Sequence, residues 1–238
     1  MAHGFIFYSL WFFCNYWCYN NFNYYTGVIG YPVLFVLLIW VVYWVEFKFN
    51  IHLKIYGIQP GKLEGLIGVF FSPFLHSSLK HLFNNTIPLF LLSSAIFYFY
   101  KKISWKIIFS GIILSGILTW IIGRDSVHIG ASGLIYVLIS FIFFKGIISK
   151  NFNLLALSLI VVFIYGSTIW YIFPIKENMS WEGHLSGFLV GILLAFIFKK
   201  NIPPNKTYNW QNENYDTTDD PFLQQFDKDG NFIEKDEL

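Results

Sequence analysis

Long apolar segments separated by short polar stretches make up most of residues 28–198. A helix needs about 17–25 mostly apolar residues to cross the roughly 30 Å of hydrocarbon in a bilayer. Six segments meet or approach that length: Val28–Phe47, Leu82–Tyr100, Ile103–Ile122, Ser132–Ile148, Asn153–Phe173 and Gly183–Phe198. The pattern therefore predicts an all-α membrane protein with six transmembrane helices, of which the last is rather short.

The connection between the first and second predicted helices, residues 48–81, is longer than the other connections and partly apolar. Its apolar stretch Leu63–Leu75 contains Gly65, Gly68 and Pro73. Glycine and proline disfavour a continuous helix, and the stretch is shorter than a bilayer requires. We expect this first loop to be partly embedded in the membrane without crossing it.

The composition is that of a membrane protein. Charged residues are 13% of the chain, about half of the roughly 25% found in soluble domains. We therefore expect membrane lipid as a partner, and because no basic tract of the kind that binds nucleic acid is present, we expect no nucleic acid. Two cysteines are too few for a disulfide framework or a zinc site, and we expect neither a metal nor a cofactor.

The two ends of the chain differ in composition from the apolar body. Residues 1–27 are rich in aromatic residues and asparagine, and we interpret them as an N-terminal extension. Residues 28–200 form the predicted transmembrane domain. Residues 201–238 hold three lysines and nine acidic residues, a composition typical of disordered segments. We expect this acidic tail to be disordered.

The distribution of basic residues predicts the orientation of the helices, because lysine and arginine collect in cytoplasmic loops. Among the short loops, one side of the bundle carries seven lysines: Lys101, Lys102, Lys106, Lys145, Lys150, Lys199 and Lys200. The short loops of the other side carry only Arg124 and Lys176, although the long first loop adds four lysines there. We therefore expect both termini in the cytoplasm and the protein in the plasma membrane.

Polar residues at membrane depth are costly and are therefore functional candidates. The first cluster of such residues opens the second predicted helix and includes His76, His81 and Asn85. His81 and Asn85 are four residues apart and share one helix face, and both side chains can donate hydrogen bonds. Taken alone, the cluster is equally compatible with a polar patch at a helix end.

The second cluster, Gly130-Ala-Ser132-Gly133, opens the fourth predicted helix. Small residues allow neighbouring backbones to approach closely, but a serine at a helix start is also a common cap. Residue 134 is leucine, so the nucleophile-elbow motif of soluble hydrolases is not met. Tyr136 follows the serine by four residues and lies on the same face.

The third cluster lies in the sixth predicted helix, where Gly183, Gly187 and Gly191 form a stripe of small residues that permits close helix contact. His184 borders this face, although a single histidine in a membrane helix is more often structural than reactive. The three clusters together favour a reactive role for His184 instead, because they supply a serine, a histidine and two further hydrogen-bond donors. A serine nucleophile needs an adjacent base, and an acyl transition state needs donors aimed at its oxyanion.

In combination, these residues resemble the motifs of the rhomboid family of intramembrane serine proteases. The resemblance covers about residues 28–200 and implies a six-helix, rhomboid-like bundle with a partly embedded first loop. The Trp-Arg pair that other members carry in this loop is absent. The matching patterns, in the family's order, are His76-x4-His81-x3-Asn85, Gly130-x-Ser132-Gly133-x2-Tyr136 and His184-x2-Gly187-x3-Gly191.

The resemblance implies that Ser132 is the nucleophile and His184 its general base, in a dyad without a third acid. The backbone N–H of Ser132 and the side chains of His81 and Asn85 would form the oxyanion hole. The implied reaction is the hydrolysis of peptide bonds in the transmembrane helices of other proteins. Cleavage would take place near the outer end of such a helix, where small or helix-breaking residues let it unwind.

Six other matching positions would support this site: Tyr136, Gly130, Gly133, Gly187, Gly191 and His76. By the resemblance, the tyrosine would pack against the His184 ring, and His76 would order the loop before the second helix. The first two glycines would let the loop that carries the nucleophile pass close to neighbouring helices. The last two would bring the sixth helix against the fourth.

Two other functions fit part of the pattern. A catalytically inactive rhomboid-like protein would bind membrane helices, but it would not need the full dyad together with both donors. A small channel or transporter would line its path with His81, Asn85 and His184, but it gives no role to the Gly130–Gly133 motif. Richness in Phe, Ile, Asn and Lys, with a first loop similar to that of some bacterial rhomboids, favours a bacterial source.

Overall fold

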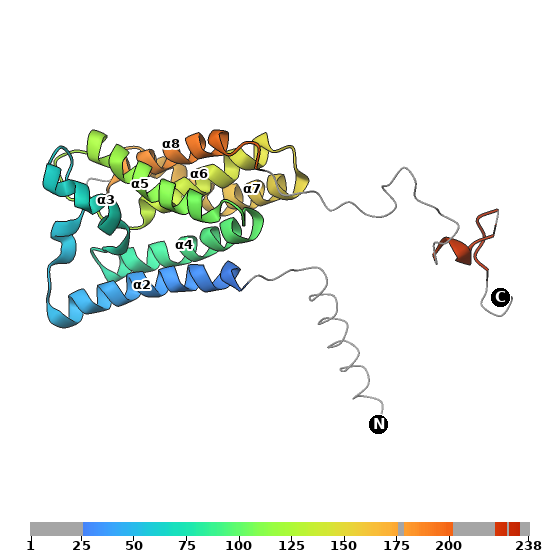
Figure 1. The fold of residues 1–238 in the computed structure, drawn as a ribbon, viewed down its shortest axis with the longest axis horizontal. Coiled ribbons are helices and arrows are strands. Elements are labelled where there is room, and N and C mark those ends of the chain that lie inside the picture. The colour runs from blue at the N-terminus through green and yellow to red at the C-terminus, as the bar shows by residue number, and fades with distance from the viewer. Residues whose placement is uncertain (1–25, 176–178, 202–221, 228, 234–238) are drawn as a thin grey trace, which may run out of the picture. The chain divides into compact units, whose positions relative to one another are not determined.

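The computed structural model describes residues 26–175, 179–201, 222–227 and 229–233 (Figure 1). The chain divides into two compact units, residues 1–203 and 204–238, and each is described by itself. The expected N-terminal extension, residues 1–27, lies almost entirely outside the described residues.

The first unit is a helical bundle built around α6 (Figure 1). Its long helices are α2 (Gly27–Phe49), α4 (Leu79–Phe99), α5 (Ser104–Ile122), α6 (Ser132–Ile148), α7 (Phe152–Tyr165) and α8 (Trp181–Ile197). Helix α6 packs against α4, α5, α7 and α8, and its side chains Val137, Leu138 and Phe141 are fully buried. No strand occurs among the described residues. The predicted all-α bundle is confirmed.

Helices α2, α4 and α5 and the continuous run Phe152–Ile172 are long and apolar enough to cross a membrane. Helices α6 and α8 have 17 residues each, which makes them about 26 Å long at 1.5 Å per residue. The hydrocarbon layer is roughly 30 Å thick, so these two helices are slightly too short to cross it completely. At least one end of each helix therefore lies inside the layer. All six predicted segments are helical, and α6 has the predicted bounds.

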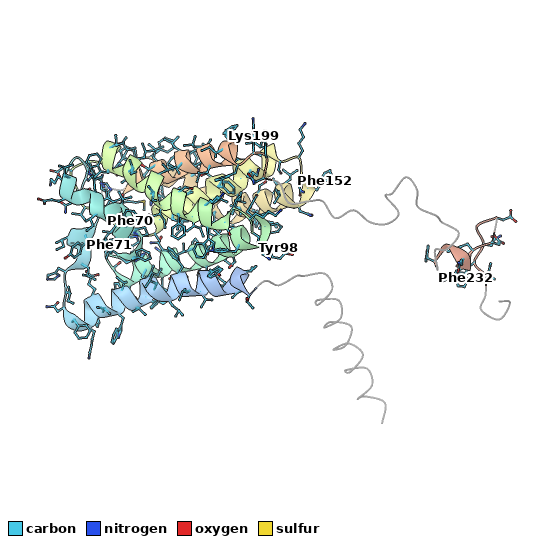
Figure 2. The ribbon with its side chains drawn as sticks, in the orientation of Figure 1. Phe70, Phe71, Tyr98, Phe152, Lys199 and Phe232 are labelled. Carbon is cyan, nitrogen blue, oxygen red and sulfur yellow. The ribbon has the colours of Figure 1, made fainter. Side chains whose placement is uncertain are left out.

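The outer surface of this unit is apolar over much of its area. Phe70, Phe71 and Phe152, all labelled in Figure 2, have 60%, 48% and 88% of their surface exposed. An apolar surface of this extent marks contact with another apolar phase. Together with the lengths of the helices, it identifies the unit as a membrane protein.

Helix α4 begins three residues before the predicted start because a serine caps it. The Ser78 hydroxyl accepts a hydrogen bond from the His81 backbone N–H at 3.2 Å, so the helix starts at Leu79. Serine satisfies one of the free N–H groups at a helix start in this way. His81 therefore lies in the first turn of α4, one turn before Asn85.

The fifth predicted segment, Asn153–Phe173, is not a single α-helix. Helix α7 ends at Tyr165, and the chain continues as the 3₁₀ helix η4 (Gly166–Ile172). Glycine at the junction weakens the α-helical conformation. A 3₁₀ helix has a tighter turn than an α-helix, so the carbonyls of Thr168 and Tyr171 point in directions that a continuous α-helix would not give them.

The first loop folds into short elements and does not cross the membrane, as predicted. These elements are η1 (Leu53–Tyr56), η2 (Leu63–Ile67), α3 (Gly68–Phe71) and η3 (Ser72–Phe74). Helix α3 packs against α5, and the backbone of Ile58 pairs with that of His128. A methyl group at Gly68 would overlap the backbone of Gly57 and Ile58, so this close contact requires a glycine.

Glycines on α8 bring this helix directly against the backbone of α6. A methyl group at Gly187 would overlap the Gly133 carbonyl oxygen, and one at Gly191 would overlap the Ser140 hydroxyl. At Gly133 itself an added methyl would make only ordinary contacts, the nearest 3.5 Å from the Gly183 oxygen. The close approach therefore depends on the glycines of α8 more than on Gly133.

A buried lysine fixes the opposite end of the α6–α8 pair. Lys145 Nζ donates to the carbonyl oxygens of Phe198 and Lys199 at 2.6 and 2.9 Å, and its side chain is fully buried. The last carbonyls of a helix have no partner within the helix. The lysine therefore supplies donors where α8 ends.

The second unit is described only at residues 222–227 and 229–233. Here η6 (Leu223–Gln225) precedes a turn in which Phe226 pairs with Phe232. The Asp227 carboxylate accepts backbone N–H groups of Asp229 and Asn231 at 2.9 and 2.8 Å, as aspartates often do in turns. Most of residues 201–238 lie outside the described residues, and the disordered tail stays a prediction.

We predict that Gly191→Ala destabilises the bundle, because the new methyl group overlaps the Ser140 hydroxyl. Overpacking of this kind costs about 1–3 kcal/mol, and thermal unfolding of the purified protein in detergent measures the loss. Gly30→Ala is the matched control, since nothing lies within 4 Å of a methyl group at that helical position. Equal melting temperatures for the two variants would contradict the proposed close contact of α6 and α8.

Candidate active site

An open cleft of about 850 Å³ lies among α4, α6, η4 and the start of α8. The predicted residues Ser132, Tyr136, His81, Asn85 and His184 all line it. Polar side chains in a membrane bundle are tolerated where they line such a cavity. The cleft is therefore the candidate active site.

Ser132 and His184 meet in this cleft. Ser132 is the first residue of α6 and His184 lies in the first turn of α8. The Ser132 Oγ and His184 Nε2 atoms are 3.0 Å apart, which is hydrogen-bond distance. The contact of α8 with α6 through glycine brings these residues together across 52 positions of sequence.

The hydrogen bond made by His184 Nδ1 determines whether Nε2 donates or accepts. Nδ1 lies 2.9 Å from the carbonyl oxygen of Tyr171 in η4. A carbonyl only accepts hydrogen bonds, so Nδ1 carries the hydrogen and Nε2 presents a lone pair. In this tautomer Nε2 accepts the hydrogen bond that the Ser132 hydroxyl donates.

Tyr136 packs on the His184 ring. The two rings are stacked with centroids 4.4 Å apart and planes 13° from parallel. The Tyr136 hydroxyl donates to the Thr168 carbonyl oxygen at 2.5 Å. Because η4 provides the acceptors for both Tyr136 and His184, this 3₁₀ helix fixes the orientation of the stacked pair.

Gly130 lies beside His81 and Asn85, the two donors of the first cluster. Its φ is +114°, a conformation that L side chains rarely adopt. A methyl group there would lie 2.7 Å from His81 Nε2 and 3.5 Å from Asn85 Nδ2. Asn85 is buried, and its Nδ2 has no hydrogen-bond partner among the described residues.

His76 packs behind His81, just before α4. Its ring lies edge to face with that of His81, with centroids 5.0 Å apart, and its Nδ1 is 3.4 Å from the Phe74 carbonyl oxygen. Burial lowers the pKa of His76 to about 4, so the ring is neutral at pH 7. The contact to Phe74 ties this neutral ring to the loop before α4.

Sequence reasoning did not foresee several polar contacts around the site. The carbonyls of Thr168 and Tyr171 carry no side-chain signal, and the 3₁₀ conformation was not predicted. Arg124, in the segment before α6, forms an ion pair with Glu182 in the first turn of α8. In the sequence, the only sign of this ion pair was that the two residues have opposite charges and lie close to the Gly130–Gly133 and His184 motifs. Among the described residues, no three His, Cys, Asp or Glu side chains gather as a metal site.

Comparison with known proteins finds a family match and several relatives. The rhomboid domain family matches residues 63–201, which is more than half of the chain. "Uncharacterized protein Rv1337" of Mycobacterium tuberculosis is 34% identical over 179 residues, which cover 68% of this chain and 72% of the relative. "Putative rhomboid protease YdcA" of Bacillus subtilis is 26% identical over 190 residues, which cover 74% of this chain and 92% of the relative.

The family match spans all three polar clusters, and the fold is the membrane helical bundle that the resemblance implied. "Uncharacterized protein ML1171" of Mycobacterium leprae, also bacterial, is 30% identical over 168 residues, which cover 63% of this chain and 62% of the relative. From the match, the motifs and the bundle together, we conclude that this chain belongs to the rhomboid family.

Proposed function

We propose that this chain is an intramembrane serine endopeptidase in which Ser132 is the nucleophile and His184 the general base. The observation that carries the proposal is the 3.0 Å contact between Ser132 Oγ and His184 Nε2 in an open polar cleft. Membership of the rhomboid family, and likeness to a relative whose name includes rhomboid protease, support the activity.

In the proposed reaction, Ser132 Oγ bonds to the carbonyl carbon of the scissile peptide while His184 Nε2 takes the hydroxyl proton. The intermediate then collapses, the C–N bond breaks, and the proton on His184 passes to the leaving amine. Water next attacks the acyl-enzyme and gives a proton to His184. Release of the new carboxyl product returns that proton to Ser132 Oγ.

The oxyanion of each tetrahedral intermediate requires donors that are already in place. We assign this role to the Ser132 backbone N–H and to the side chains of His81 and Asn85. Two features support the assignment: Asn85 Nδ2 is buried without a partner among the described residues, and both side chains lie against Gly130. A buried donor without an acceptor is costly, and an oxyanion would satisfy it.

A carbonyl replaces the acid of a three-residue catalytic triad. In serine hydrolases with a triad, a carboxylate holds the histidine in its working tautomer. Here the Tyr171 carbonyl accepts the Nδ1 hydrogen of His184, and Tyr136 holds the plane of the ring. These contacts support a dyad that needs no third side chain.

The proposed substrates are the transmembrane helices of other proteins. The backbone of such a helix is hydrogen-bonded internally, so a peptide bond reaches Ser132 only after the helix unwinds locally. Small or helix-breaking residues near the cut would lower the cost of unwinding. We place the protein in the bacterial plasma membrane with both termini in the cytoplasm, and we place the cleft toward the outer face.

We predict that Ser132→Ala and His184→Ala each abolish cleavage of a transmembrane substrate, with a loss of at least about 10³-fold. A fluorophosphonate probe should label the wild type and neither variant, and gel fluorescence measures this. Ser110→Ala is the control, because that hydroxyl donates only to carbonyls of its own helix. Labelling that persists in Ser132→Ala would reject Ser132 as nucleophile. An unlabelled wild type that still binds membrane helices would favour an inactive rhomboid-like protein.

We predict that Asn85→Ala lowers kcat by about 10²–10³-fold, the usual effect of removing one oxyanion donor. Substrate KM should change little, because the oxyanion forms only during the reaction. Asn153→Ala is the control, since this amide is exposed and does not line the cleft. Steady-state kinetics of both variants test the assignment, and an equal kcat for the two would refute it.

A further inference from the structure

The positions of Ser132 and His184 depend on where their helices start. Ser132 is the first residue of α6, and His184 lies in the first turn of α8. The segment before α6, residues 123–131, is irregular, and we call it the nucleophile loop. Whatever holds this loop to the start of α8 therefore controls the 3.0 Å contact between the two side chains.

An ion pair joins the nucleophile loop to the first turn of α8. The Glu182 carboxylate oxygen Oε1 lies 3.5 Å from Arg124 Nε and 3.4 Å from the Arg124 backbone N–H. The Arg124 guanidinium also donates to the Met179 carbonyl oxygen at 2.7 Å. Arg124 thus binds both a side chain and the backbone at the start of α8.

The carboxylate of this pair is buried. The Glu182 side chain is only 1% exposed, and its second oxygen has no hydrogen-bond partner among the described residues. A buried charge that loses its partner is strongly destabilised, because no water replaces that partner. Glu182 also lies in the first turn of α8, where a negative charge interacts favourably with the helix dipole.

A second contact joins the same two segments. His128 of the nucleophile loop lies 2.5 Å from the Ser180 hydroxyl through its Nδ1 atom. The backbone of His128 also exchanges two hydrogen bonds with Ile58, at 3.0 and 2.9 Å. The nucleophile loop is therefore held to the start of α8 by two contacts, and it is also held to the first loop.

The neighbouring ion pair has a different environment. Lys62 Nζ lies 3.2 Å from Asp125 Oδ1, but the two side chains are 56% and 86% exposed. Exposed pairs contribute little to stability because water screens them. Asp125 is the residue next to Arg124. Asp125→Asn therefore removes a charge from the same loop without breaking the Arg124–Glu182 pair.

We propose that Arg124 and Glu182 are positioning residues of the dyad. Their ion pair holds the start of α8 against the nucleophile loop, so that His184 Nε2 meets Ser132 Oγ. The proposal rests on the proposed function of that dyad. Glu182 does not line the cleft, whereas Arg124 does, so Glu182→Gln is the variant in which loss of the pair should slow the reaction of Ser132 more than it weakens binding.

The test is the rate at which a fluorophosphonate probe labels Ser132 in the full-length protein, measured over a range of probe concentrations. This yields a maximal rate and an apparent affinity without a known substrate. The variants are Arg124→Gln, Glu182→Gln, the double variant and the control Asp125→Asn. All are compared at a temperature where circular dichroism shows each one folded. If Arg124→Gln does not fold, Arg124→Lys and Glu182→Gln replace it.

We expect Arg124→Gln and Glu182→Gln each to lower the maximal labelling rate by at least about tenfold, and Glu182→Gln to keep an apparent affinity within about twofold of wild type. The double variant should be no slower than the slower of the two single variants, because either single change already breaks the pair. Asp125→Asn should match the wild type.

Three results would overturn the proposal: an unchanged maximal rate in Arg124→Gln, single effects that simply multiply in the double variant, or an equal loss in Asp125→Asn. An unlabelled wild type would instead reject the proposed function, and this inference with it.

Discussion

The direct contact between the backbones of α6 and α8 is the constraint on which the site depends. At Gly187 and Gly191 no side chain of α8 stands between the two helices. Ser132 and His184 approach within 3.0 Å only because the helices that carry them touch. A hydrogen bond fails when its atoms separate beyond about 3.5 Å, so a small outward shift of α8 would break the pair.

Irregular backbone inside a membrane bundle must find partners for its polar groups, because lipid offers none. In this protein, several of the groups that satisfy the irregular backbone lie in the candidate active site. The Gly130 N–H donates to the Ser72 carbonyl oxygen at 2.8 Å, and the Thr168 and Tyr171 carbonyls accept from Tyr136 and His184. The requirement to satisfy the backbone and the requirement to orient reactive side chains are met by the same hydrogen bonds.

The sequence predicted the helices well because apolar length is a strong signal in a membrane protein. It did not predict the start of α4 at the Ser78 cap or the 3₁₀ helix after Tyr165, since both depend on local hydrogen bonds within apolar surroundings. The meeting of Ser132 and His184 followed from the family resemblance, because nothing in the spacing alone brings the two together. The pairing of Arg124 with Glu182 spans 58 positions and leaves no periodic trace.

The carbonyl that orients His184 has an evolutionary consequence. A carboxylate in a triad is lost by a single codon change, whereas residue 171 presents a main-chain carbonyl with any side chain. Comparison of related sequences would therefore leave this orienting group unmarked, and scanning mutagenesis would pass over it. The inherited feature is the path of the chain through η4, so insertion or deletion of one residue there would disturb the orientation of His184, whereas a point substitution would not.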